Sequence, residues 1–168
     1  MCRGRKIYIY MKITKTNAMR ELENHGIEYE VFTYEHGKEA VDGVHVAQLL
    51  QEDPNCVFKT LVTQANTKEY LVFMVPVIHE LDLKKAASLA GVKNTEMISV
   101  KDITKITGYV RGGCSPLAMK KQFRTFIDET AILYDAIYFS AGKIGLQIKT
   151  NPEKLMELLQ ISPGNIIK

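Results

Sequence analysis

A lysine lies inside a short apolar segment, Val57-Phe58-Lys59-Thr60-Leu61-Val62. Side chains alternate between the two faces of a strand, so a strand here would place Lys59 on the same face as Val57 and Leu61. Desolvation of an ammonium group is costly and lowers its pKa. Lys59 is therefore either an edge-strand lysine whose aliphatic stem is buried, or a cation over a pocket that binds an anion or orients a carbonyl.

A glycine-rich segment is the second unusual feature: Gly108-Tyr109-Val110-Arg111-Gly112-Gly113-Cys114-Ser115-Pro116. Gly112 and Gly113 carry no Cβ and reach positive φ at little cost. Pro116 fixes its own φ and keeps Ser115 out of the helical region. Such a loop suits the binding of a carbonyl or a ribose through backbone N–H groups. On composition alone, a tight turn between a strand and a helix is the more common explanation.

Cys114 and Ser115 could act as nucleophiles, but the sequence supplies no evident partner for them. A reactive cysteine needs a nearby base and an electropositive site. The four histidines are not recognisably arranged for that role: His25, His36, His45 and His79. The chain also has no Gly-x-Ser-x-Gly elbow, no HExxH pair and no P-loop. The residues argue against a hydrolase triad, a zinc site and an NTPase, and no metal or cofactor is expected.

Composition and length indicate one globular domain. The chain has 168 residues, of which 46% are hydrophobic and 24% charged, with a net charge of +3; this charge is only weak evidence for a polyanionic partner. The three cysteines, Cys2, Cys56 and Cys114, lack metal-ligand spacing, so free thiols are expected. No apolar run reaches the roughly 18 residues of a membrane span, and no secretory signal is evident. A cytoplasmic protein without a membrane partner is expected.

Met11 offers a second plausible start. Residues 1–12 are therefore expected to be an N-terminal extension that need not be native, followed by a single domain over 13–168. Hydrophobic periodicity and capping signals predict helices at 17–24, 43–51, 83–90, 101–106 and 152–160, and a turn of helix at 119–123. Strands are predicted at 27–34, 57–64, 70–77, 96–99, 124–127, 136–140 and 146–149. The tail from Ser162 is expected to be loosely held.

The predicted strands alternate with short helices, and several are joined in pairs by short turns, without strict βαβ order. This pattern favours an α+β fold with a mixed, curved sheet. Four segments then resemble the YbaK family of aminoacyl-tRNA deacylases, which is related to the editing domains inserted in bacterial prolyl-tRNA synthetases. The segments are 58–62, 81–86, 107–116 and 140–146. They occur in the family's order, and the resemblance runs from about Thr16 to Leu159. It implies a small, barrel-like sheet surrounded by helices.

Within that family, the chain most resembles the free-standing Cys-tRNA(Pro) deacylases, which remove cysteine wrongly attached to proline tRNA and so maintain translation fidelity. The resemblance implies that Lys59 is the essential lysine, which holds the terminal adenosine or the aminoacyl group. It also implies that the backbone of Gly112 and Gly113 lies against the ester and stabilises the oxyanion. In this family the thiol of the substrate is thought to attack the ester and leave as a thiolactone. No protein nucleophile would then be needed.

The resemblance also implies that Tyr34, Thr60 and Ser140 form the wall of the substrate pocket. One departure concerns Asp42, which stands where family members often carry an aromatic residue. This difference leaves the fine shape of the amino-acid pocket open. The choice between Cys-tRNA(Pro) and Cys-tRNA(Cys) stays open as well.

Basic side chains are the candidates for contacts with tRNA phosphates. These candidates are Lys84, Lys85, Lys120, Lys121 and Arg124. A solvated helix face explains them at least as well. A prolyl-tRNA synthetase is a further candidate partner. Three other functions remain open: a deacylase for another small amino acid, as in Ala-tRNA(Pro); a non-catalytic module that binds tRNA or a synthetase; and, more distantly, a thiol-redox protein that uses Cys114.

Overall fold

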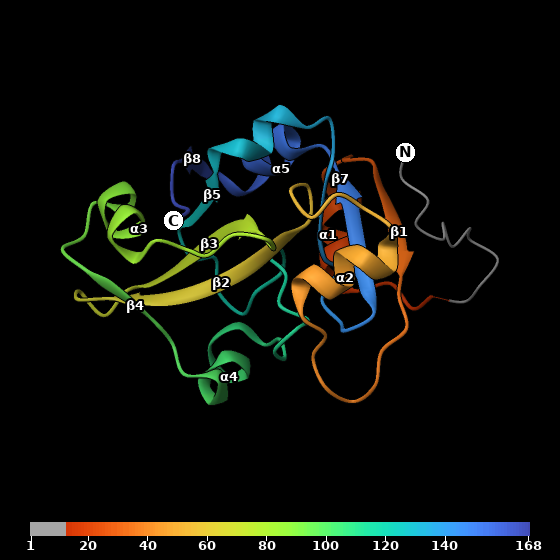
Figure 1. Ribbon diagram of the computed structural model, residues 1–168, viewed down its shortest axis with the longest axis horizontal. Coiled ribbons are helices and arrows are strands. Elements are labelled where there is room, and N and C mark those ends of the chain that lie inside the picture. Colours follow the sequence, from red (N-terminus) through yellow and green to blue (C-terminus); the bar gives the residue numbers. More distant parts are fainter. Residues whose placement is uncertain (1–12) are drawn as a thin grey trace.

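The computed structural model describes residues 13–168, so the expected extension at 1–12 lies outside the described residues. The strands form two sheets (Figure 1). The antiparallel three-stranded sheet has the order β1 (Tyr29–Thr33), β7 (Leu146–Thr150), β6 (Ile137–Ser140). The mixed five-stranded sheet has the order β4 (Thr95–Met97), β2 (Phe58–Ala65), β3 (Tyr70–Pro76), β5 (Thr125–Asp128), β8 (Ser162–Gly164).

Short helices surround these sheets, and the expected α+β class is confirmed. The α-helices are α1 (Asn17–Asn24), α2 (Gly43–Leu50), α3 (Leu83–Ala90), α4 (Ile103–Thr107) and α5 (Pro152–Leu159). Two 3₁₀ helices, η1 (Val100–Asp102) and η2 (Glu129–Leu133), complete the described elements. Figure 1 shows α3 near β4 at one end of the five-stranded sheet, whereas α1 and α2 lie beside the three-stranded sheet.

Local capping signals explain where several helices begin and end. The Asp82 carboxylate accepts hydrogen bonds from the N–H groups of Lys84 and Lys85, and Gly91 ends α3 in the left-handed conformation. The side chain of Asn151 likewise accepts from Lys154 N–H at 3.0 Å, with Pro152 in the first turn of α5. These side chains satisfy backbone donors that have no partner inside the helix, as the sequence predicts.

Two predictions were wrong. Residues 119–123 form no helix, because tertiary contacts take the nearby backbone donors: Ala118 N–H bonds the Glu21 carboxylate at 2.7 Å, and Lys120 N–H bonds the Thr107 carbonyl at 3.0 Å. The tail from Ser162 is not loose either. It forms β8, which pairs in parallel with β5, and Ile166 is fully buried.

The start of β2 is an edge, because its ladder with β4 covers only Thr63 to Ala65. Just before β2, Val57 makes an isolated parallel bridge with Tyr138 of β6. The N–H of Tyr138 donates to the Cys56 carbonyl at 2.9 Å. This link brings the start of β2, which carries the conspicuous lysine, next to the three-stranded sheet.

Candidate active site

A cleft of about 1130 Å³ borders the edge of β2. Its other walls come from segment 38–42 and the start of α2, from β4, η1 and α4, from the glycine-rich loop, and from the ends of β6 and β7. The predicted catalytic and substrate-binding residues line this cleft, with the exception of Gly113. Those that line it are Tyr34, Lys59, Thr60, Gly112 and Ser140. The fold thus brings together residues that are far apart in the sequence.

Lys59 is a partly buried cation in this cleft. Desolvation lowers the pKa of Lys59, while the carboxylates of Glu80 and Asp42 oppose that shift. Asp42 itself lines the cleft. A partly desolvated ammonium interacts more strongly with an anion or a polarised carbonyl than a fully hydrated one does. Lys59 lies at the unpaired edge of β2 and also lines the cleft; its role toward a ligand stays a prediction.

Gly112 is the part of the glycine-rich loop that reaches the cleft. It has φ +82°, and a Cβ there would lie 2.7 Å from the Cβ of Ala40. Gly113 lies behind it, against the backbone of Lys143 and Ile144. The Gly113 N–H donates to the Val110 carbonyl at 3.0 Å. The loop is therefore held closely against its neighbours, and the Gly113 N–H is engaged within it.

Two buried polar atoms in the cleft have no hydrogen-bond partner among the described residues: Thr60 Oγ1 and Gln147 Oε1. Gln147 lies in β7 directly opposite Ser140 of β6. The Ser140 hydroxyl already accepts a hydrogen bond from Gly142 N–H at 3.2 Å. Sequence reasoning missed Gln147, and the available signal was weak: a polar residue between the apolar residues Leu146 and Ile148.

Cys114 also lines the cleft. Burial raises the pKa of its thiol to about 12, although a hydrogen bond with Thr107 acts in the opposite direction. A thiol with that pKa is almost entirely protonated at neutral pH and is a poor nucleophile. This environment counts against a role for Cys114 in nucleophilic or redox chemistry.

The predicted phosphate-binding residues do not line the cleft. Arg124 contacts the Glu69 carboxylate at 2.8 Å and the Ala90 carbonyl at 3.0 Å. Lys85 donates to the Ile167 carbonyl at 2.8 Å, and Lys120 donates to the Lys105 carbonyl at 3.2 Å. Lys84 and Lys121 are exposed.

Two other exposed cations, Lys38 and Arg111, do line the cleft. Sequence reasoning did not select either of them. Arg111 could have been found, because it lies inside the glycine-rich segment; nothing in the sequence distinguishes Lys38. Lys59 is therefore accompanied in the cleft by two solvent-exposed positive charges.

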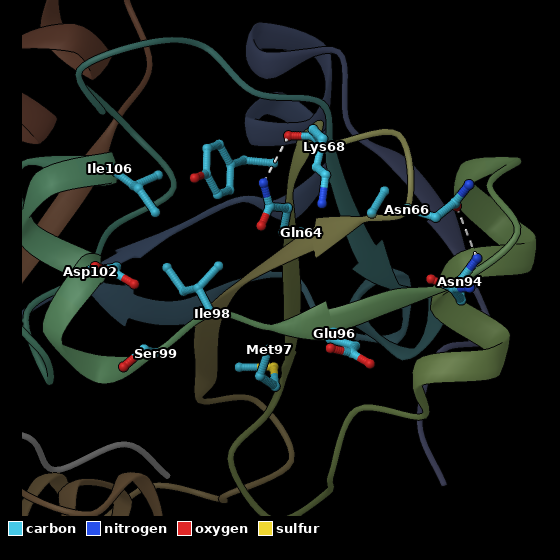
Figure 2. A pocket seen from close by; sticks show the side chains of 12 residues that line it. Gln64, Asn66, Lys68, Asn94, Glu96, Met97, Ile98, Ser99, Asp102 and Ile106 are labelled. Carbon is cyan, nitrogen blue, oxygen red and sulfur yellow. Dashed lines mark hydrogen bonds between the residues drawn. The ribbon is translucent and has the colours of Figure 1, made fainter.

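A second, smaller groove of about 340 Å³ lies beside β4 (Figure 2). It is mostly polar, and Met97 and Ile98 line both this groove and the cleft. Figure 2 shows that two of its amides are already engaged: Gln64 with the Lys68 carbonyl at 3.2 Å, and Asn66 with Asn94 N–H at 3.2 Å. Over residues 13–168, no three metal-ligating side chains gather at one point. Within the same range, no helix is both long and apolar enough to cross a membrane.

Comparison with known proteins identifies the family. Residues 38–158 match the model of the aminoacyl-tRNA editing domain. A protein of Enterococcus faecalis with the provisional name Cys-tRNA(Pro)/Cys-tRNA(Cys) deacylase EbsC is 44% identical over 144 residues, which cover 86% of this chain and 88% of that protein.

Solved structures share the fold at low sequence identity. The hypothetical protein APE2540 has a TM-score of 0.82 at 17% identity and covers 91% of this chain and 100% of its own. A protein provisionally described as a trans-editing enzyme for prolyl-tRNA synthetase has a TM-score of 0.78 at 19% identity and covers 92% of this chain and 99% of its own. The resemblance to the YbaK family is confirmed, and this chain belongs to the aminoacyl-tRNA editing domain family.

Proposed function

We propose that this protein is a trans-editing deacylase that cleaves the ester bond of mischarged Cys-tRNA(Pro), and also that of Cys-tRNA(Cys). The observation that carries the proposal is the 44% identity, over most of both chains, to the protein named as a deacylase of these two substrates. The cleft supports it, because Lys59, Thr60 and Ser140 lie together there with the glycine-rich loop. The substrate is an aminoacyl-tRNA, and the reaction needs no protein-bound cofactor.

In the proposed reaction, the sulfur of the substrate cysteine attacks its own ester carbonyl. The carbon–sulfur bond forms as the bond to the ribose 3′-oxygen breaks. The thiol proton passes to that oxygen, so the products are a cysteine thiolactone and tRNA with a free 3′-end. Lys59 holds the terminal nucleotide or the aminoacyl group in position, and the Gly112 backbone lies against the ester. The raised pKa of the Cys114 thiol supports a substrate nucleophile, because burial disfavours the thiolate of this residue.

Contacts with tRNA outside the cleft are also part of the proposal. Lys84, Lys85, Lys120, Lys121 and Arg124 are proposed to lie near phosphates, together with Lys38 and Arg111 at the cleft. A prolyl-tRNA synthetase is the proposed partner that delivers the mischarged tRNA. The similarity in fold to the protein described as a trans-editing enzyme for that synthetase supports this choice.

We further infer that the two sheets act as one curved, barrel-like surface around the cleft. The bridge between Val57 and Tyr138 supports this inference. It joins the start of β2 to β6, so residues of both sheets line the same cleft.

A panel of mischarged tRNAs tests the function. Wild type is expected to deacylate Cys-tRNA(Pro) and to leave Cys-tRNA with a blocked thiol intact. Lys59→Ala is expected to abolish turnover while the circular dichroism spectrum stays that of wild type. Wild-type turnover by Lys59→Ala would overturn the assignment of Lys59. Turnover of Ala-tRNA(Pro), or of thiol-blocked Cys-tRNA, would replace the thiol mechanism with attack by water. Binding without turnover of any substrate would identify a non-catalytic module.

A further inference from the structure

Gln147 carries a buried acceptor that the protein itself leaves unused. The residue is 5% exposed, and its Oε1 has no hydrogen-bond partner among the described residues. A buried polar atom without a partner costs folding free energy, so such atoms are uncommon in native proteins. Because Gln147 lines the cleft, the group that satisfies Oε1 can come from a bound ligand.

The position of Gln147 indicates which part of the substrate reaches it. It lies in β7, the middle strand of its sheet, between Phe32 of β1 and Ser140 of β6. Directly opposed residues on neighbouring strands face the same side of a sheet, so Gln147 and Ser140 lie side by side on the cleft floor. The polynucleotide is bulky and carries charged phosphates. The small aminoacyl end is therefore the part of an aminoacyl-tRNA that reaches a buried floor.

The chemistry of the acceptor indicates which group of the aminoacyl end binds to Gln147. A cysteinyl ester carries two kinds of hydrogen-bond donor, the α-amino group and the thiol. A thiol is a weak donor, whereas a protonated amine has only donors and needs an acceptor when it leaves water. The carbonyl oxygen of Gln147 can only accept, and the unpartnered Thr60 Oγ1 provides a second acceptor in the same cleft.

We propose that the side-chain carbonyl of Gln147 binds the α-amino group of the cysteinyl ester, and that this contact orients the aminoacyl group for attack by its own thiol. The inference rests on the proposed deacylase function and assigns a substrate contact within it. Gln147 is thus a specificity-determining residue, because it selects α-amino acyl groups over acyl groups of the same size that lack the amine.

The test combines a change in the protein with a change in the substrate. Gln147→Met and wild type are assayed with Cys-tRNA(Pro) and with 3-mercaptopropionyl-tRNA(Pro), which keeps the thiol but lacks the amine. Loss of a hydrogen bond to a charged donor reduces kcat/KM by about 10- to 100-fold. The Gln147→Met substitution alone, and removal of the substrate amine alone, are each expected to reduce kcat/KM by this factor. With the substrate that lacks the amine, Gln147→Met is expected to cause no further reduction. Equal losses with both substrates would overturn the proposal.

Further variants separate a substrate contact from a structural role. Gln147→Glu retains a side-chain acceptor and is expected to recover most of the discrimination between the two substrates. Gln48→Met, at an exposed position of α2, serves as the matched control and is expected to behave as wild type. The thermal midpoint of Gln147→Met is expected to equal or exceed that of wild type, because the substitution removes an unpaired buried acceptor.

If Gln147→Met fails to fold, wild type and Gln147→Glu still decide the question. Loss of discrimination by Gln147→Glu, or equal turnover of both substrates by wild type, would overturn the proposal. A wild-type protein that is inactive on every Cys-tRNA would overturn the proposed function and this inference together. If wild type is active but the substitution at Gln147 and the loss of the substrate amine act independently, only the inference about Gln147 is overturned.

Discussion

At the scale of one residue, Lys59 is a cation whose burial disfavours folding and which lines the candidate active site. Burial lowers its pKa, and the nearby carboxylates of Glu80 and Asp42 only oppose that effect. Thr60 and Gln147 add two unpaired acceptors to the same cleft. Each of these groups would be more favourable in water or with a partner. Because all three groups line the same cleft, their location supports a polar ligand that binds there and supplies the missing partners.

The lowered pKa of Lys59 predicts a pH-dependent stability effect. The unfolded chain binds more protons than the folded one between the lowered pKa and the ordinary lysine value of about 10.4, so stability rises with pH across that window. Lys59→Met removes the cost of burying the charge. It is expected to unfold at a higher temperature than wild type at neutral pH, and this advantage is expected to shrink as pH approaches the ordinary lysine value.

Thermal unfolding of wild type and Lys59→Met, followed by circular dichroism at several pH values, checks this prediction. Lys93→Met, at an exposed position, is the matched control for loss of a surface lysine. A lower midpoint for Lys59→Met than for wild type at neutral pH would contradict the expected cost of burying Lys59.

At the scale of elements, the glycine-rich loop derives its shape from contacts with segments far away in the sequence. Gly112 lies against Ala40, and Gly113 lies against Lys143 and Ile144. The sequence predicted a bare and rigid loop from Gly112, Gly113 and Pro116. The division of roles, with Gly112 at the cleft and Gly113 behind it, depends on segments that the loop meets only after folding.

Gly112→Ala is expected to reduce kcat/KM for Cys-tRNA(Pro) by at least about 10-fold, because misplacement of groups around the ester is costly. The new Cβ would lie 2.7 Å from Ala40 Cβ, at a residue with φ +82°. The left-handed conformation alone costs about 1–2 kcal/mol of stability for a residue with a Cβ. Steady-state kinetics and thermal unfolding measure the two effects.

Gly26→Ala is the control for the strain alone. Gly26 has φ +68°, and nothing lies within 4 Å of a Cβ placed there. This variant is expected to lose similar stability while keeping wild-type activity. Equal activity of the Gly112→Ala variant and wild type would show that the position of this loop does not matter for the reaction.

At the scale of the whole molecule, the exposed cations proposed to contact tRNA lie in different places. Lys38 and Arg111 line the cleft, whereas Lys84 lies on α3, near the far end of the five-stranded sheet (Figure 1). A tRNA whose 3′-end enters the cleft passes Lys38 and Arg111. Cations near the path of the nucleic acid contribute most to affinity and to its salt dependence.

The double variant Lys38→Glu/Arg111→Glu is expected to raise the KM for Cys-tRNA(Pro) about 10-fold or more at low salt and to flatten its salt dependence. Lys84→Glu/Lys121→Glu changes the net charge by the same amount and is expected to have a smaller effect. Measurement of KM at several salt concentrations for wild type and both variants checks this. A larger effect of the second pair would place the tRNA path near α3 or near the segment that carries Lys121, outside the cleft.

Several elements could be predicted because their signals are local. Asp82 and Gly91 bracket α3, and Asn151 with Pro152 starts α5. For the site, some residues could be predicted from the sequence and others could not. Lys59 stands out as a charge in an apolar strand, whereas Gln147 differs little from any polar strand residue. The tail from Ser162 was wrongly expected to be loose, because its pairing with β5 joins residues far apart in the sequence.

The amino-acid sequence alone was sufficient for the α+β class, for the family, and for five residues that line the cleft: Tyr34, Lys59, Thr60, Gly112 and Ser140. These depend on residue types, spacing and short motifs, which are properties of neighbouring positions. The folded chain was needed to distinguish Gly112 from Gly113, to single out Gln147, and to show that Arg124 is engaged with Glu69 while Lys38 and Arg111 reach the cleft. The physical reason is that burial and hydrogen-bond partners are set by contacts between distant segments, and these contacts exist only after the two sheets have come together.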